Sequence, residues 1–130
     1  MQLEHAWVQR MARKQTRPLP GAEEIVRQCR ELLDEKLARD IVVLDLRGLS
    51  TITDYFVICN GESLRQNTTL AEHLMASFEA TGLRATHVEG LDDARWVVLD
   101  YIVAIVHIFD TETRELYTLE KLWGDAKRVE

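Results

Sequence analysis

The chain has 130 residues, of which 46% are hydrophobic, and this composition favours one folded domain over a disordered chain. Apolar runs are too short for a membrane-spanning helix and the N-terminus lacks the apolar stretch of a signal peptide, so we expect a cytoplasmic protein. The net charge of −6 is uneven: residues 1–20 carry +3 and the remainder carries −9. An acidic domain binds nucleic acid poorly but suits a basic protein partner.

The N-terminal segment, residues 1–20, shows no sustained apolar period and ends in two prolines. We expect a flexible basic extension there, followed by a single α/β domain over residues 21–130. This domain begins with a predicted helix, Ala22–Arg39, because apolar residues recur at spacings of three and four. Two glutamates open the helix and Lys36 and Arg39 close it, an order that the helix dipole favours.

Two strands and a second helix are predicted next. The apolar segments Ile41–Leu46 and Asp54–Asn60 are joined by a short turn, which makes them antiparallel neighbours. Ser63 is a good N-cap, and Gln66 three residues later completes a capping box. The helix that follows should end at Gly82. Its predicted buried face is apolar: Leu64, Leu70, Ala71, Leu74, Met75 and Phe78.

The densest apolar stretch, Arg95–Asp110, is interpreted as two adjacent strands with a tight reversal, Trp96–Tyr101 and Ala104–Phe109. Their nearly continuous apolar character is typical of central strands covered on both faces. The strand–helix–strand unit before them should cross over right-handed, which places Ala85–Val88 parallel to the second strand.

A turn at Thr111–Arg114 and a short strand or helix at Leu116–Trp123 should close the domain. The predicted fold class is therefore α/β, with a mixed sheet of about five strands flanked by helices. Cys29 and Cys59 fall in the apolar patterns of a helix and a strand, which is typical of buried, reduced thiols.

Motifs for catalysis are weak. Gly61-Glu62-Ser63 before a helix could hold an anion, but the capping box explains the same residues. The alternative function, a nucleotidyltransferase-like enzyme, needs two metal-binding carboxylates one residue apart on the strand after that helix. Here Glu89 has His87 at the paired position, and Asp92 and Asp93 are adjacent. We expect a protein that is not an enzyme, with no catalytic residue and no cofactor.

Histidines invite a metal hypothesis, since His87, His107 and Glu89 could share one sheet. No His-x-x-x-His or Cys-x-x-Cys spacing occurs, and a histidine inside an apolar strand is more typical of a hydrogen-bonded structural residue. We therefore expect no metal site. A triad of Ser50, His107 and Asp100 can be drawn, but no nucleophile elbow supports it.

Aromatic residues interspersed with acids are more informative, because they are typical of a protein-binding face. They gather near one strand and near the C-terminus: Trp96, Asp100, Tyr101, Tyr117, Glu120 and Trp123. Packing in the core is the alternative for each residue taken singly.

The same residues also match a known family. From Ala38 to the C-terminus the sequence resembles the ribosomal silencing factors, also called RsfS, YbeB or iojap-like proteins. The resemblance rests on short segments in a fixed order and spacing: Asp45 with Ser50, Thr53–Ile58, Gly61–Ser63 with Arg65-Gln66, Val88–Gly90, Trp96–Tyr101, Val106–Phe109, Arg114–Tyr117 and Leu119–Trp123.

This resemblance implies a mixed sheet with the shape of a nucleotidyltransferase but without its catalytic carboxylates. It also implies binding to the large ribosomal subunit through ribosomal protein uL-fourteen, which blocks docking of the small subunit and represses translation when nutrients are scarce. Little direct contact with nucleic acid is expected. The strand from Trp96 contributes to this contact in the family, and the residues expected at the partner face are Trp96, Val97, Val98, Asp100 and Tyr101, with Glu120 as a weaker acidic contributor.

One departure from the family lies between the two central strands. The family usually has Gly-Asp there, whereas this chain has Ile102-Val103. Two β-branched residues fit a primed hairpin turn poorly, because that turn needs positive φ. Either the turn changes type or the strands are longer. Apolar residues exposed at this turn would favour self-association, so a homodimer of the free chain is a third hypothesis.

Overall fold

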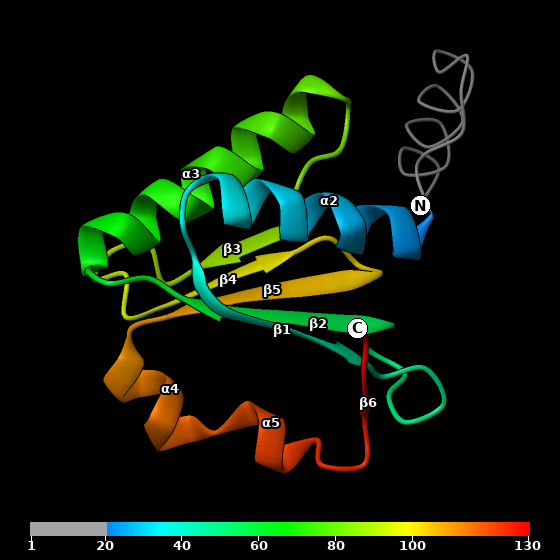
Figure 1. Cartoon of the computed structure of the whole chain (residues 1–130). Helices are drawn as coiled ribbons and strands as arrows, with labels where there is room; N and C mark the ends of the chain where they lie inside the picture. Colours follow the sequence, from blue (N-terminus) through cyan, green and yellow to red (C-terminus); the bar gives the residue numbers. More distant parts are fainter. Residues whose placement is uncertain (1–20) are drawn as a thin grey trace.

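The computed structural model describes residues 21–130, and the basic extension expected over residues 1–20 lies outside the described residues. The elements are α2 (Ala22–Glu35), β1 (Arg39–Asp45), β2 (Tyr55–Asn60), α3 (Leu64–Ala80), β3 (His87–Glu89), β4 (Trp96–Asp100), β5 (Ala104–Phe109), α4 (Thr111–Tyr117), α5 (Leu119–Leu122) and β6 (Lys127–Arg128). Within residues 21–130 the strands form one sheet in the order β3-β4-β5-β2-β1-β6. Figure 1 shows α2 and α3 over one face of this sheet and α4 and α5 on the other side. The predicted mixed sheet flanked by helices is confirmed.

The sheet is mixed because its central pair, β2 and β5, runs parallel, with Tyr55 opposite Ala104. The other neighbouring pairs among the described strands are antiparallel, including the predicted β1–β2 and β4–β5 pairs. β3 runs in the same direction as β2, as the crossover rule predicted, but it pairs with β4 at the edge of the sheet. The β4–β5 hairpin separates β3 from β2, because β5 takes the place beside β2.

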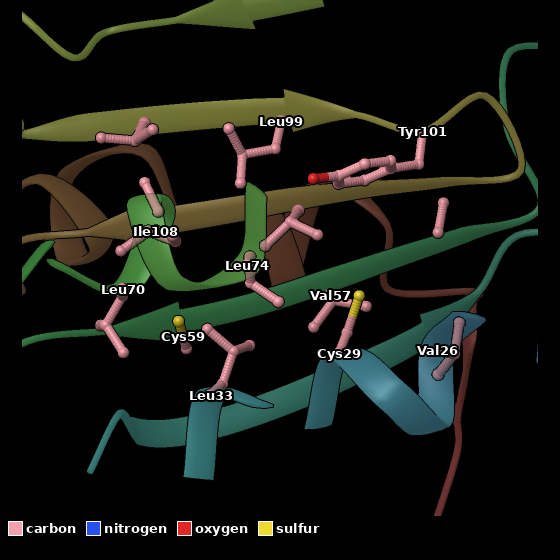
Figure 2. Close-up of a cluster of buried hydrophobic side chains, with 14 of the residues drawn as sticks. Val26, Cys29, Leu33, Val57, Cys59, Leu70, Leu74, Leu99, Tyr101 and Ile108 are labelled. Carbon is pink, nitrogen blue, oxygen red and sulfur yellow. The ribbon is translucent and has the colours of Figure 1, made fainter. Parts of the chain in front are cut away.

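The main core lies between the sheet and the helix pair α2 and α3. Apolar residues at helical spacing supply one side of it: Ile25, Val26, Cys29 and Leu33 from α2, and Leu70, Ala71, Leu74 and Phe78 from α3. Alternate residues of the strands, such as Val57, Leu99 and Ile108, supply the other side (Figure 2). Cys29 and Cys59 are free, buried thiols in this core, and burial raises the pKa of each to about 12. They are reduced and buried, as predicted.

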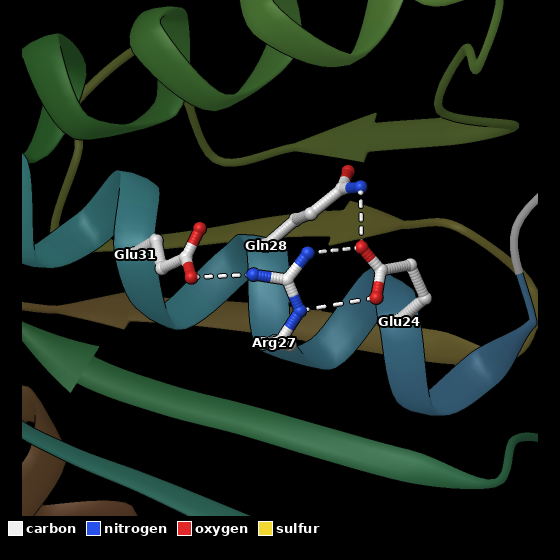
Figure 3. Close-up of polar contacts among 4 residues, drawn as sticks. All are labelled: Glu24, Arg27, Gln28 and Glu31. Atoms are coloured by element: carbon white, nitrogen blue, oxygen red, sulfur yellow. Dashed lines mark hydrogen bonds and ion pairs between the residues drawn. The ribbon is translucent and has the colours of Figure 1, made fainter.

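The exposed face of α2 carries a polar network around Arg27. Its guanidinium contacts the carboxylates of Glu24 and Glu31, and Gln28 donates to Glu24 at 3.0 Å (Figure 3). The hydrogen bond from Arg27 lowers the pKa of Glu24 below its usual range. Because these side chains lie in water, the network stabilises the helix only slightly.

Helix α2 ends at Glu35, earlier than predicted, because Leu37 has left-handed backbone with a φ of 63°. Lys36 and Arg39 therefore lie beyond the last helical turn, and the prediction that they complement the helix dipole is wrong. The carbonyl oxygens of Lys36 and Leu37 instead accept hydrogen bonds from the Gln66 side chain, at 3.0 and 3.2 Å. The start of α3 thus caps the end of α2.

The predicted capping box of α3 is present with one change. The hydroxyl of Ser63 accepts a hydrogen bond from the Gln66 backbone N–H at 3.0 Å, as predicted. Gln66 Oε1, however, accepts from the N–H of Glu62 rather than of Ser63, at 2.6 Å. Leu64 is exposed at the first position of the helix, so its assignment to the buried face is wrong.

Two short helices take the place of the turn and closing segment predicted after β5. Asp110 Oδ1 accepts a hydrogen bond from the Thr113 N–H at 2.7 Å, so Thr111–Arg114 is the first turn of a capped helix. Thr118, with a φ of 43°, ends α4 and leads into α5. The chain then returns to pair β6 with β1, a strand that the sequence did not indicate.

Candidate protein-binding face

The face of the sheet opposite α2 and α3 is rich in aromatic side chains. The register of β4 and β5 places Trp96 opposite Phe109 and Val98 opposite His107. Because side chains alternate along a strand, these four residues share one face, whereas Val97 projects into the core under the helices. This aromatic face, defined by Trp96, Val98, His107 and Phe109 with their neighbours, is the candidate site.

Trp96 lies at the centre of this face. Its ring centroid is 4.9 Å from that of Phe109 and 4.8 Å from that of Tyr117 on α4. Its indole Nε1 donates a hydrogen bond to His107 Nδ1 at 3.0 Å. Phe56 of β2 packs against His107 with the ring centroids 4.5 Å apart. Trp96 is half-buried and Tyr117 is 49% exposed, so the cluster reaches the surface at these two rings.

His107 is the buried polar member of the face. It is 6% exposed, and burial lowers its pKa to about 4, so the ring is neutral at pH 7. Because Nδ1 accepts from Trp96, the proton is on Nε2, which is buried without a hydrogen-bond partner. The residue is a hydrogen-bonded structural histidine, as predicted. A triad with Ser50 and Asp100 does not form, since Nδ1 is already engaged.

Two contacts fix the start of β4 and therefore the position of Trp96: one is made by Asn67 and the other by Gly90. Asn67 of α3 is fully buried; its Oδ1 accepts from the Gly61 N–H at 3.0 Å and its Nδ2 donates to the Ala94 carbonyl at 2.8 Å. Gly90 has a φ of +86°, and a Cβ at this position would lie 1.9 Å from the Trp96 carbonyl oxygen. Only glycine fits there without moving β4.

The residues expected at the partner face divide into two groups. Trp96, Val98 and Asp100 are half-buried and lie on the aromatic face. Val97 and Tyr101 are 0% and 3% exposed and lie in the core under α2 and α3. The side chains of these two residues are therefore not at the surface of the free chain, and a role for them at the partner face stays a prediction. Alternation along a strand with one covered face turns every second residue inward.

Asp100 and Glu120 are both engaged within the chain. Asp100 Oδ1 accepts from the Ile102 N–H at 2.7 Å and so shapes the β4–β5 turn. The Glu120 carboxylate pairs with Arg114 at 3.0 Å, and the same guanidinium donates to Asn60 Oδ1 at 2.7 Å. This network joins α4 and α5 to β2, so Glu120 has a structural contact independent of any partner.

The β4–β5 turn keeps a tight reversal despite its β-branched residues. The strands end at Asp100 and resume at Ala104, so they are not lengthened. The N–H of Val103 donates to the Tyr101 carbonyl at 2.8 Å, and Ile102 between them has a φ of 70°. A β-branched residue rarely adopts positive φ. Ile102 is also 62% exposed, so an apolar side chain stands at this end of the sheet.

The backbone N–H groups of Gly61 and Glu62, considered above as an anion site, donate to side chains of the same chain. The N–H of Gly61 donates to Asn67 Oδ1, and the N–H of Glu62 donates to Gln66 Oε1. The capping reading of this segment is therefore the one that the contacts support.

Residues weighed as metal ligands are arranged as follows. His87 Nε2 and Glu89 Oε1 are 3.1 Å apart on the exposed edge strand β3. In the part of the chain that the structure describes, no cluster of three or more His, Cys, Asp or Glu side chains could hold a metal ion. Over the same residues, no helix has the length and apolar character needed to cross a lipid bilayer.

Sequence reasoning named Trp96 and Tyr117 but missed how Phe56, His107 and Phe109 join them. Period-two alternation could have revealed this. In a tight β4–β5 hairpin, Trp96 and Val98 must lie on the same face of the sheet as His107 and Phe109. A histidine inside an apolar strand also indicated a buried hydrogen bond, here the one that it accepts from Trp96.

This arrangement defines a small single-sheet α/β protein whose distinctive surface is a partly exposed aromatic face. Residues 20–130 match the family described as "Ribosomal silencing factor during starvation", RsfS. The chain belongs to this ribosomal silencing factor family, which confirms the resemblance seen in its sequence.

Individual relatives agree with this assignment. The chain is 43% identical over 93 residues to the "Ribosomal silencing factor RsfS" of Bacillus subtilis, covering 72% of this chain and 79% of the relative. It is 34% identical over 106 residues to the mouse protein named "Mitochondrial assembly of ribosomal large subunit protein 1", covering 79% of this chain and 46% of that protein. A crystal structure of a Bacillus halodurans protein superposes with a TM-score of 0.75 at 34% identity, covering 83% of this chain and 98% of the other.

Proposed function

We propose that this chain binds the large ribosomal subunit through ribosomal protein uL-fourteen, sterically blocks joining of the small subunit and so represses translation under nutrient limitation. Membership of the ribosomal silencing factor family carries the proposal. The mouse relative named for assembly of the mitochondrial large subunit supports the large subunit as the target. The proposed role is binding without catalysis.

The contact that we propose is the aromatic face around Trp96. Trp and Tyr side chains dominate the energetics of protein interfaces, and Trp96 and Tyr117 lie side by side at the surface of this one. Val98 adds a half-buried apolar side chain on the same face, opposite Glu89 of the edge strand. The negative charge of residues 21–130 complements a basic ribosomal protein. Val97 and Tyr101 support the strand from the core side.

The test is co-sedimentation of the chain with purified small and large subunits, separately and mixed. Binding to the large subunit alone, with fewer joined ribosomes in the mixture, is the expected result. Capture by isolated ribosomal protein uL-fourteen then tests the named partner. Binding to the small subunit, binding to neither subunit, or a stable homodimer that ignores ribosomes would contradict the proposal.

Matched variants locate the contact. Val98 lies opposite Glu89 in the β3–β4 pair, so a lysine at position 98 has an acid beside it and should fold. Against a basic partner, Val98→Lys should weaken binding more than Val98→Glu does. Leu37→Ala removes an exposed apolar side chain at the end of α2 and should bind as the wild type does. Equal effects of all three variants would remove this face from the contact.

A further inference from the structure

The indole N–H of Trp96 is hydrogen-bonded to His107, a residue that is itself almost fully buried. We propose that His107 is a positioning residue, which holds the Trp96 indole by its N–H so that the ring presents an apolar surface to the ribosomal partner. The inference rests on the proposed function and adds to it the residue that orients the central aromatic side chain.

The geometry places His107 on the neighbouring strand, diagonally across from Trp96. Val98 is the residue directly opposite His107, and Trp96 lies two residues earlier on β4. The hydrogen bond from Trp96 Nε1 to His107 Nδ1 is 3.0 Å long, and the two ring planes are tilted by 43° with centroids 6.0 Å apart. Phe109 and Tyr117 pack against the indole ring, and the hydrogen bond adds a contact that depends on where the N–H edge of the ring lies.

The hydrogen bonds of His107 bring little net stability, because one of its two ring nitrogens is paired and the other is not. β5 is otherwise apolar, and His107 buries a ring whose Nε2 finds no hydrogen-bond partner. Leaving such a donor unpaired costs about 1–3 kcal/mol, which offsets the stability that the hydrogen bond from Trp96 supplies at Nδ1. What the imidazole supplies is an acceptor at Nδ1. A buried polar residue inside an otherwise apolar strand is expected at positions where function requires it.

The hydrogen bond also defines what Trp96 can offer. With its N–H directed inward to His107, the indole has no donor for the partner. The partner group that contacts it is therefore one that needs no hydrogen bond, either an aliphatic side chain or a cation over the ring face. Both are available on a basic protein.

The wild-type chain provides the first test. In ¹⁵N NMR spectra, His107 should show a protonated Nε2 and an unprotonated Nδ1, and the Trp96 indole N–H should exchange slowly with water. The three tryptophan indole signals are assigned with Trp96→Phe. The opposite tautomer, or a fast-exchanging Trp96 indole, would overturn the proposal without any variant at position 107.

Two variants at position 107 then link orientation to binding. His107→Leu removes the acceptor, and we expect a folded chain with a shifted, fast-exchanging Trp96 indole signal and about tenfold weaker binding to the large subunit. His107→Asn keeps an oxygen near the place of Nδ1 and should recover part of both readouts. A folded His107→Leu chain that binds as tightly as the wild type would overturn the proposal. If the wild type binds no ribosomal particle, the proposed function fails, while the indole signal still decides whether His107 orients Trp96.

Discussion

The side-chain amide of Asn67 donates to the carbonyl oxygen of Ala94 at 2.8 Å and thereby ties helix α3 to the loop that begins β4. The other end of the same amide accepts from the N–H of Gly61 at 3.0 Å. Gly61, Asn67 and Ala94 are all buried, so one side chain satisfies two backbone groups that water cannot reach. The position of Trp96 depends on this link, because β4 starts directly after the loop.

Replacing Asn67 by leucine should lower the free energy of unfolding by roughly 2 kcal/mol, because it leaves the buried Ala94 carbonyl without a donor and the Gly61 N–H with only its bond to the Phe109 carbonyl, at 3.2 Å. Urea unfolding followed by circular dichroism measures the change. Thr69→Ala is the control: it removes a methyl group and a hydroxyl that donates to the Arg65 carbonyl, both on the exposed side of the same helix. A cost below about 1 kcal/mol for Asn67→Leu would mean that the two loops do not need the bridge.

Gly90→Ala and Gly48→Ala form a matched pair, since both glycines have nearly the same positive φ, +86° and +85°. A Cβ at Gly48 meets nothing within 4 Å, so its alanine variant should lose only about 1–2 kcal/mol of backbone strain. A Cβ at Gly90 would lie 1.9 Å from the Trp96 carbonyl oxygen, so the second variant should lose more than about 3 kcal/mol or fail to fold. Equal losses in thermal unfolding would contradict the close approach of β4 to this loop.

Ile102→Gly should stabilise the chain by roughly 1 kcal/mol. Relief of a β-branched residue from positive φ outweighs the added backbone entropy of glycine in the unfolded chain. Val103→Gly is the contrast: Val103 packs against the core and lacks positive φ, so that variant should destabilise. Denaturant midpoints decide the signs.

The same Ile102→Gly variant tests self-association. Because Ile102 is an exposed apolar side chain, its removal should weaken any homodimer seen by sedimentation velocity. A dimer of unchanged affinity would place the interface elsewhere.

The buried His107 should make stability depend on pH between about 6.5 and 4. Burial lowers its pKa from 6.5 to about 4, so in this window the unfolded chain binds a proton that the native chain does not. Its contribution is complete above pH 6.5 and falls as pH drops to about 4, by ~3 kcal/mol in total. Urea unfolding of the wild type and His107→Asn across this window measures it. Identical slopes for the two chains would contradict a buried neutral imidazole.

Carboxylates contribute to acid sensitivity at lower pH. Hydrogen bonds from Arg47 lower the pKa of Asp45, and hydrogen bonds from Thr113 lower the pKa of Asp110 against the opposing effect of burial. The stability that these two groups add is present above their unfolded pKa of about 4 and is lost below it. The histidine window therefore lies above the carboxylate window, and the two can be separated in one titration.

Elements with strong local signals were predictable from the sequence. The hairpin of β4 and β5, the Ser63 cap and the amphipathic face of α2 all follow from patterns within one element or between adjacent ones. The starts of α2 and α3 and the bounds of β4 and β5 agree closely with the structure because turn chemistry and hydrophobic period act locally, whereas α2 ends four residues earlier than predicted.

What the sequence could not supply depends on contacts between distant segments. β6 is two residues long and exists only because it pairs with β1, so no period could reveal it. The short helices α4 and α5 are held by Arg114, which bonds to Asn60 of β2 and to Glu120. The direction in which Tyr101 points follows from which face α2 and α3 cover, and that choice is made by the whole sheet.

The parallel pairing of β2 with β5 at the middle of the sheet has a kinetic consequence. Along the chain, α3, β3 and β4 separate Tyr55 from its partner Ala104, whereas the β4–β5 hairpin closes within a few residues. Closing the long loop between β2 and β5 costs conformational entropy before the strands make contact. The β4–β5 hairpin should therefore form early, and docking of β2 should limit the rate of folding. During that interval the edge of β5 is open, and a nascent chain on the ribosome is most prone to mispair at this strand.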